Sequence, residues 1–191
     1  MWLFALAITI PLGLDLYLPA PEDNPITEEK IELGRRLFFD KRLSRDQSVS
    51  CSTCHEPELA FADGKPVAIG VFGRKGRRNA PALINRGYGR AFFWDGRVKT
   101  LEEQVLKPVE DTNEMDLKVE EAAARVGLTA ETMARALATY VRSLLSGDAP
   151  FDRYIHGDRD ALSAEQRRGL ELFRGKRSEE RRVGKECRSR W

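Results

Sequence analysis

The sequence predicts an all-α protein whose helices are joined by long loops. Several segments repeat an apolar residue every three or four positions and follow a Ser or Thr that can cap a helix. By contrast, residues 63–90 contain six glycines and two prolines and show no alternation typical of strands, so we expect an irregular loop there. A length of 191 residues suits one domain of this kind.

The first expected helix begins after Thr27 and ends near Phe38. The Thr27 side chain can cap its first turn, and Glu28 and Glu29 carry negative charge at the positive end of the helix dipole. One face of this helix is expected to contact the core or a bound cofactor, and it consists of Ile31, Gly34, Leu37 and Phe38.

Three further helices are expected towards the C-terminus. Thr100 opens a capping box and a short helix that Pro108 should end, and Ser163 opens a second box. The clearest helix follows Thr129, and Gly147 should stop it. Its apolar stripe consists of Met133, Leu137, Tyr140, Val141 and Leu144.

The segment Cys51-Ser52-Thr53-Cys54-His55 matches the C-x-x-C-H pattern of covalent c-type haem attachment. Two thiols at this spacing can add to the two vinyl groups of haem, and the histidine can ligate the iron from the proximal side. A zinc site would need a second pair of ligands, and only Cys187 and His156 remain. A thioredoxin-type pair would need a βαβ setting, which the pattern does not indicate. We therefore predict one covalent haem c.

Few side chains are available for the other face of the iron. His156 falls in an expected turn far from the haem motif and should be solvated. Met133 lies on an apolar stripe, where packing in the core is expected, and Met115 is the other methionine candidate. The sixth position is therefore empty, filled by water or filled by methionine. An open haem binds peroxide, whereas a closed one carries electrons.

Peroxide chemistry also requires a group that moves a proton between the two peroxide oxygens. Glu114, in an irregular segment after Pro108, is a candidate, although most of the 30 acidic residues should simply be solvated. The segment Phe92–Arg97 (FFWDGR) has two interpretations. It is a core anchor with a structural ion pair, which the residues alone favour, or an electron-transfer contact beside a haem edge.

Both ends of the chain are expected to lie outside a domain that spans residues 18–176. Residues 1–17 begin with an apolar run too short to cross a bilayer as a helix, which indicates a signal or anchor segment. Covalent haem also implies export, so we expect a periplasmic location. Residues 177–191 lack apolar periodicity and look like a translated sequencing adapter, an artefact outside the fold. Without this basic tail the charge is nearly balanced, and no nucleic-acid partner is expected.

Six segments in order resemble the N-terminal haem domain of the bacterial dihaem cytochrome c peroxidase and MauG family. The resemblance runs from about residue 18 to residue 176 and implies a cytochrome c-like haem domain, cut off before a second haem motif. The segments are LGRRLFFD (33–40), LSRDQSVSCSTCH (43–55), RRNAPALIN (77–85), FFWDGR (92–97), LEEQ (101–104) and EM (114–115).

The resemblance also implies roles for single residues. Cys51 and Cys54 would hold the peroxidatic haem, with His55 as its proximal ligand. Many family peroxidases carry a histidine in an Ile-Gly-His setting after the haem motif, and this histidine ligates the resting iron. Here Gly70 is followed by Val71, so we expect an oxidised haem that is already open.

Four other positions match family residues outside the haem motif. Glu114 would be the distal acid–base residue, and Gln104 would help to orient peroxide. Trp94 would lie on the electron path between two haems. Asn79 matches a residue that helps to bind calcium at a domain interface.

The activity implied for the intact enzyme is reduction of hydrogen peroxide to water with electrons from a small cytochrome c or cupredoxin. The resemblance also suggests a homodimer. Alternatives are a MauG-type enzyme that oxidises tryptophan residues of a partner protein and a monohaem electron-transfer cytochrome. Because the second haem motif is absent, we expect this chain to bind one haem and to turn over peroxide poorly.

Overall fold

A computed structural model describes residues 8–175 of the protein. In it, the expected helices begin directly after the residues that were predicted to cap them. Within that range the chain forms helices, short 3₁₀ turns and three isolated β-bridges, and no strand. It divides into two compact units, one of residues 8–10 and 16–146 and the other of residues 11–15 and 147–175. The expected tail 177–191 and the start of the expected signal segment lie outside the described residues.

The larger unit holds six of the α-helices described. They are α1 (Glu28–Phe38), α2 (Cys51–Cys54), α3 (Leu101–Gln104), α4 (Lys107–Glu110), α5 (Val119–Arg125) and α6 (Ala130–Ser143). The smaller unit holds α7 (Pro150–Ile155) and α8 (Ala164–Arg174). None of the described helices is long and apolar enough to cross a membrane.

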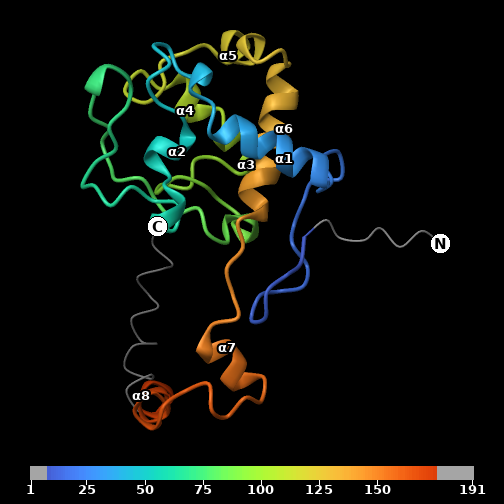
Figure 1. Ribbon diagram of the computed structural model, residues 1–191, viewed down its shortest axis with the longest axis vertical. Helices are drawn as coiled ribbons and strands as arrows, with labels where there is room; N and C mark the ends of the chain where they lie inside the picture. The colour runs from blue at the N-terminus through green and yellow to red at the C-terminus, as the bar shows by residue number, and fades with distance from the viewer. Residues whose placement is uncertain (1–7, 176–191) are drawn as a thin grey trace, which may run out of the picture. The chain divides into compact units, whose positions relative to one another are not determined.

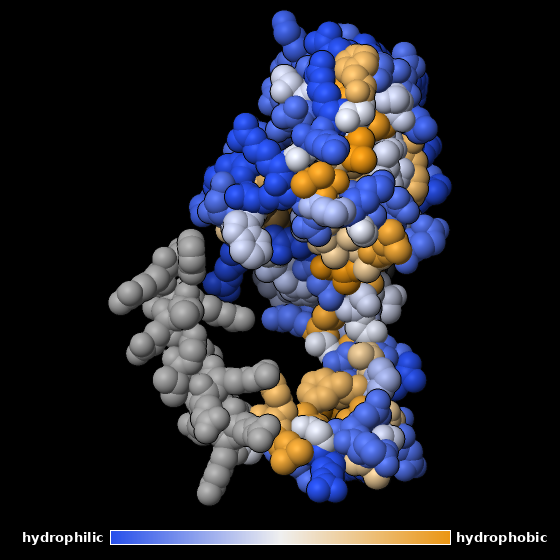
Figure 2. All heavy atoms as spheres, turned by 90° about the vertical axis from the view of Figure 1, so that its left-hand side faces the viewer, coloured by the Kyte–Doolittle hydropathy of each residue, from blue (hydrophilic) through white to orange (hydrophobic). Residues whose placement is uncertain are grey.

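The core of the larger unit is built on the packing of α1 against α6, which cross in Figure 1. Thr27 caps α1 by accepting a hydrogen bond from the Lys30 N–H, as the sequence predicts. Phe38 at the end of α1 packs on Tyr140 of α6, with ring centroids 5.1 Å apart. Gly34 permits this close approach, because a Cβ there would meet the backbone of Ala136. On the face drawn in Figure 2, apolar residues form small separate groups among hydrophilic ones.

Four residues of the predicted apolar stripe, Met133, Leu137, Tyr140 and Val141, are buried in α6. The fifth, Leu144, is half-buried, and the helix ends before Gly147. Ser143 is its last residue, and Leu144 leaves the helical conformation. The loop residue Asn85 explains the early end, because its backbone N–H donates to the Leu144 carbonyl at 2.8 Å. Its side chain also exchanges two hydrogen bonds with the backbone of Ser146.

The expected role of Pro108 was wrong. Thr100 caps α3 as predicted, but α3 already ends at Gln104, and Pro108 lies in the first turn of the next helix. A first-turn proline needs no backbone donor, and its fixed φ suits a helix start. Two short helices, α3 and α4, therefore replace the single one that was expected.

The glycine-rich stretch 63–90 is irregular, as predicted, apart from two 3₁₀ turns, Val71–Gly73 and Arg86–Tyr88. Hydrogen bonds rather than regular structure hold it in place. The Val71 N–H donates to the Glu114 carbonyl at 2.8 Å. The Arg74 guanidinium reaches the Thr112 carbonyl at 2.6 Å and the Asp116 carboxylate at 2.9 Å. This loop therefore fixes the backbone on both sides of Glu114.

Candidate functional site

The helix α2 presents the two cysteines and the histidine of the C-x-x-C-H motif to one cavity. Its turn is closed at the start because the Ser50 N–H donates to the Thr53 hydroxyl at 3.0 Å. At the other end the His55 N–H donates to the Cys51 carbonyl at 3.0 Å. One helical turn brings residues three and four positions apart to the same side. Cys51, Cys54 and His55 therefore all line the same space.

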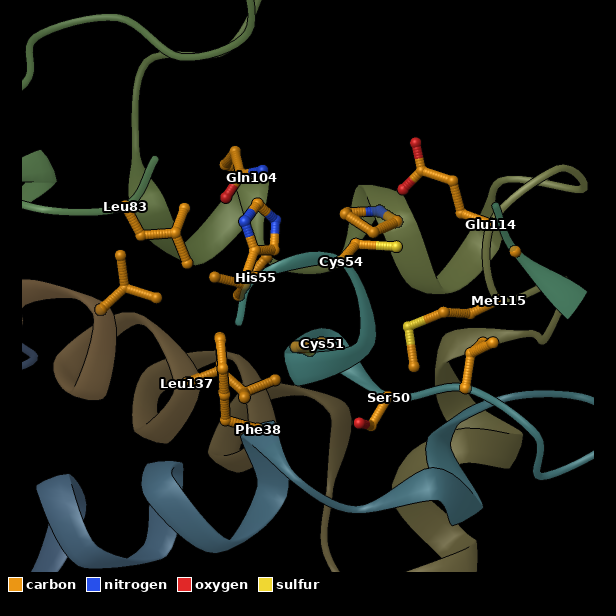
Figure 3. Close-up of a pocket in the computed structure, with 15 residues that line it drawn as sticks. Phe38, Ser50, Cys51, Cys54, His55, Leu83, Gln104, Glu114, Met115 and Leu137 are labelled. Atoms are coloured by element: carbon orange, nitrogen blue, oxygen red, sulfur yellow. The ribbon is translucent and has the colours of Figure 1, made fainter. Parts of the chain in front are cut away.

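About 630 Å³ of space not filled by atoms lies in this cavity, counting the solvent at its open mouth. Figure 3 shows its lining, which comes from α1, α2, α3, α6 and the segments between them. The apolar lining residues include Phe38, Val49, Leu83, Val105, Leu137 and Val141. A flat, largely apolar group would replace water against these walls, and the hydrophobic effect would favour its binding.

His55 is held in the tautomer that a metal ligand requires. Its Nδ1 lies 2.8 Å from the Phe61 carbonyl oxygen. A carbonyl can only accept, so Nδ1 carries the proton and Nε2 keeps a lone pair for a metal. Burial also lowers the pKa of His55, partly opposed by the hydrogen bond to the backbone carbonyl of Phe61. The ring is therefore neutral at pH 7.

The two cysteines are free thiols in an environment that disfavours thiolate. Burial raises the pKa of Cys51 to about 12, and the neighbouring Cys54 adds to the effect. Burial and then the charge of Glu114 raise the pKa of Cys54. Catalytic redox dithiols need the opposite, a lowered pKa. A covalent partner within the cavity therefore suits these thiols better than disulfide exchange.

Glu114 is the acidic side chain of this cavity. Burial raises the pKa of its carboxyl, Asp111 raises it further, and Arg97 opposes both. In the view of Figure 3, Cys54 is drawn between Glu114 and His55. A carboxyl with a raised pKa can both accept and return a proton near neutral pH, as general acid–base chemistry requires.

Gln104 and Met115 also line the cavity. Gln104 is the last residue of α3, and α3 is fixed to α6 by a two-pronged ion pair between Glu102 and Arg142 with N–O distances of 2.6 and 2.8 Å. Met115 is 4% exposed. It places a thioether at the cavity wall, where the sequence left methionine ligation open.

Two predicted site residues lie elsewhere. Trp94 is 87% exposed and does not line the cavity. Its neighbours form a separate cluster, in which Arg97 pairs with Asp95 at 2.9 Å and stacks over Phe93 at 3.7 Å. Asn79 is exposed in the long loop. Within residues 8–175 no group of three or more His, Cys, Asp and Glu side chains is placed to hold a metal ion.

Some lining residues were not predicted as site residues. Leu137 and Val141 were expected only as core, and Leu83 and Val49 were given no role beyond lying in segments that resemble the family. The α6 stripe could have suggested Leu137 and Val141, because the apolar face of a helix can line a cofactor as well as a core. Phe38 was on the face expected to contact core or cofactor, and it both belongs to the core and lines the cavity.

Comparisons with known proteins identify the family of this chain. Residues 28–130 match a family model described as di-haem cytochrome c peroxidase. The chain belongs to this family. The di-haem peroxidase family implies haem c as the cofactor, and the cavity beside Cys51, Cys54 and His55 fits such a group in polarity and donor atoms. The all-α, cytochrome c-like fold is likewise confirmed.

The relatives of this chain include proteins named MauG and proteins named cytochrome c peroxidase. The chain is 43% identical over 177 residues to the methylamine utilization protein MauG of Methylorubrum extorquens, which covers 83% of this chain and 50% of the relative. It is 36% identical over 183 residues to the cytochrome c551 peroxidase of Pseudomonas aeruginosa, covering 83% and 53%. A solved MauG-like protein associated with microbial copper homeostasis matches with a TM-score of 0.72 and 36% identity, covering 92% and 52%. The chain thus spans about half the length of the relatives it matches.

Proposed function

We propose that this chain is the peroxide-reacting haem unit of a di-haem peroxidase, which reduces hydrogen peroxide to two waters with two electrons and two protons. The observation that carries the proposal is the single cavity shared by the C-x-x-C-H motif and the buried Glu114 carboxyl. A haem protein that only transfers electrons has no need of a proton-moving carboxyl at its iron.

The protein side chains would divide the work as follows. Cys51 and Cys54 would bind haem through thioether bonds, and His55 Nε2 would ligate its iron. The bound haem supplies an iron that exchanges electrons with peroxide. Glu114 would take the proton from one peroxide oxygen and deliver it to the other, so that the leaving oxygen departs as water. Gln104 would hold the peroxide by its side-chain amide.

We further propose an open haem face in the oxidised protein. Val71 supports this proposal, because it occupies the position of the family's resting ligand and cannot bind iron. It is fully buried and does not line the cavity, whereas its neighbour Gly70 does. Because Gly70 has no side chain, the loop can pack closely against the backbone of Asn113 and Glu114.

Electrons would reach the haem from a small cytochrome c or cupredoxin, and we propose Trp94 as part of that path because its indole is exposed. Calcium binding through Asn79, a periplasmic location, a homodimer and a second haem belong to the same proposal for the whole enzyme. These features rest on the family resemblance. The domain limits 18–176 also stay a prediction.

One observation favours a second candidate function. Met115 brings a thioether to the cavity, and a methionine ligand would make the chain a monohaem electron carrier. Methionine ligation would close the face on which Glu114 is proposed to act. A MauG-type oxidation of partner-protein tryptophan would use the same haem site and is supported by the 43% identical relative.

The test is the reaction of haem-loaded protein with one equivalent of hydrogen peroxide, followed by stopped-flow absorbance. Glu114→Gln should slow this reaction about 10²- to 10⁴-fold, the usual contribution of a general acid–base group. Glu110→Gln is the matched control, since Glu110 is an exposed carboxylate four residues away that does not line the cavity. Equal rates for the wild type and Glu114→Gln would refute the proposed proton transfer.

A further inference from the structure

Asp63 is a buried carboxylate that the proposed function leaves without a role. The residue is 4% exposed, and its Oδ1 accepts a hydrogen bond from the Lys65 N–H at 3.0 Å. Its Oδ2 is the one buried side-chain nitrogen or oxygen in residues 8–175 that has no hydrogen-bond partner. Burying a carboxylate oxygen without a partner is unfavourable, so such a group needs a compensating charge or a functional reason.

The backbone before Asp63 forms a tight turn that leads back to His55, the proposed haem ligand. Glu56 and Ala62 form an isolated bridge, in which the Glu56 N–H donates to the Ala62 carbonyl at 2.9 Å. Between them Ala60 and Phe61 both adopt positive φ, at 55° and 59°, which non-glycine residues rarely do. This tight turn places the Phe61 carbonyl on His55 Nδ1, and Asp63 follows two residues later. Strained backbone next to His55, which would ligate the iron, indicates a functional constraint.

Asp63 acts electrostatically on this site. Its charge contributes to raising the pKa of both His55 and Cys54, two residues of the haem motif. Lys65 acts on Cys54 in the opposite direction, but its side chain is exposed and therefore screened by water. Glu114 acts on Cys54 more strongly than Asp63 does, so Asp63 is the second acidic residue whose charge reaches the motif.

We propose that Asp63 is a tuning residue that lowers the reduction potential of the haem held by His55. The inference rests on the proposed function, because it requires haem at Cys51 and Cys54. Ferric haem carries one more positive charge than ferrous haem, so a nearby buried anion stabilises the ferric form. A low potential favours the oxidised side of the cycle, which a peroxidase needs when it gives electrons to peroxide.

The test is a spectroelectrochemical titration at pH 7 of haem-loaded wild-type protein and variants. Asp63→Asn keeps the shape and removes the charge. At the wild-type midpoint potential it should lower the ferric-to-ferrous ratio about tenfold, which is about 59 mV for a one-electron couple. A change of about tenfold is the order of the Coulomb interaction between one partly desolvated unit charge and the haem iron. Asp63→Ser, which also lacks the charge, should shift the ratio in the same direction.

Two controls separate charge from structure. Asp63→Glu retains the charge and should stay within about twofold of the wild type. Glu58→Gln removes an exposed carboxylate from the same turn and should also change the ratio less than about twofold, because water screens it. The inference is overturned if Asp63→Asn and Asp63→Ser leave the ratio unchanged, or if Asp63→Glu shifts it as much as they do.

Haem staining of the denatured proteins distinguishes this inference from the proposed function. Wild-type protein without covalent haem would refute the proposed haem site itself. Haem that is retained in every variant, with no shift in potential, would refute only the role of Asp63.

Discussion

Removing one partner of the ion pair between Glu102 and Arg142 should strongly destabilise the larger unit. Arg142 is 5% exposed, and its guanidinium meets both carboxylate oxygens of Glu102, at 2.6 and 2.8 Å. Asn24 donates a further hydrogen bond to Glu102 at 2.7 Å. The pair joins α3, whose last residue is Gln104, to α6. Removing Arg142 therefore strands a partly buried carboxylate and loosens the helix that carries a proposed site residue.

The expected loss in the free energy of unfolding depends on how deeply Glu102 is buried, because Glu102 remains without its partner. Breaking a buried pair by removing one partner costs about 3–5 kcal/mol. The Glu102 side chain is 20% exposed and keeps the bond from Asn24, so Arg142→Met should lie near the lower end, at about 3 kcal/mol. The measurement is the free energy of unfolding from urea titration of haem-loaded protein, followed by circular dichroism.

A matched control and a double-mutant cycle isolate the interaction. Arg35→Met removes an arginine paired with Glu32 on the surface, with side chains 55% and 48% exposed, and should cost less than about 1 kcal/mol. Combining Arg142→Met with Glu102→Gln should recover part of the loss, because no uncompensated charge remains. An Arg142→Met protein as stable as Arg35→Met would refute the reasoning.

The same pair predicts a dependence of stability on pH. Burial alone would raise the pKa of Glu102, but hydrogen bonds from Arg142 and Asn24 outweigh it and leave the pKa below the usual 4.5. A folded-state pKa below the unfolded one adds stability that is complete above the unfolded value and is lost as pH falls through the folded value. Wild-type protein should thus lose this contribution below about pH 4.5, whereas Arg142→Met should show little of it.

Three further predictions concern the site and the core. The rate of the peroxide reaction should fall as pH is lowered through the raised pKa of Glu114, because only the carboxylate can accept a proton; an acid limb at or below 4.5, or one that persists in Glu114→Gln, would contradict this. Gly34→Ala should lower the free energy of unfolding in urea by about 1–3 kcal/mol, because the clash with the Ala136 backbone outweighs a helix-propensity gain of about 1 kcal/mol; unchanged or increased stability would refute it. Gly70→Ala should slow the single-turnover peroxide reaction about tenfold or more, because a Cβ would meet the Glu114 backbone. Gly76→Ala is the control and should not slow the reaction, because a Cβ there would make only ordinary contacts. Equal rates for the two variants would count against the proposed packing.

The helices and the haem motif could be predicted from the sequence because their signals are local. Thr27, Thr100, Thr129 and Ser163 each cap the helix that was expected after them. Capping depends on hydrogen bonds within three residues, so sequence patterns record it directly. Family membership, first indicated by six separated segments, is confirmed by the match over residues 28–130.

The errors arose where distant residues decide the local structure. The end of α6 at Ser143 depends on Asn85, a residue almost 60 positions earlier in the chain, which no helical pattern reveals. Pro108 was read as a helix stop, although the same residue suits a helix start. Glu114 and Gln104 line the same cavity as Cys51 and Cys54. The family resemblance predicted this arrangement, whereas the spacing of these residues in the sequence did not. Asp63 carried no sequence signal, because its importance lies in burial without a partner.

The most direct test of the account is the ferric absorption spectrum of the purified, haem-loaded chain, recorded before and after one equivalent of hydrogen peroxide. We predict covalent haem on Cys51 and Cys54, with His55 as ligand and the opposite face open. The ferric protein should therefore give a high-spin spectrum that changes on adding peroxide. A low-spin spectrum that peroxide leaves unchanged would contradict this prediction and would point to a sixth ligand, with Met115 as the first candidate.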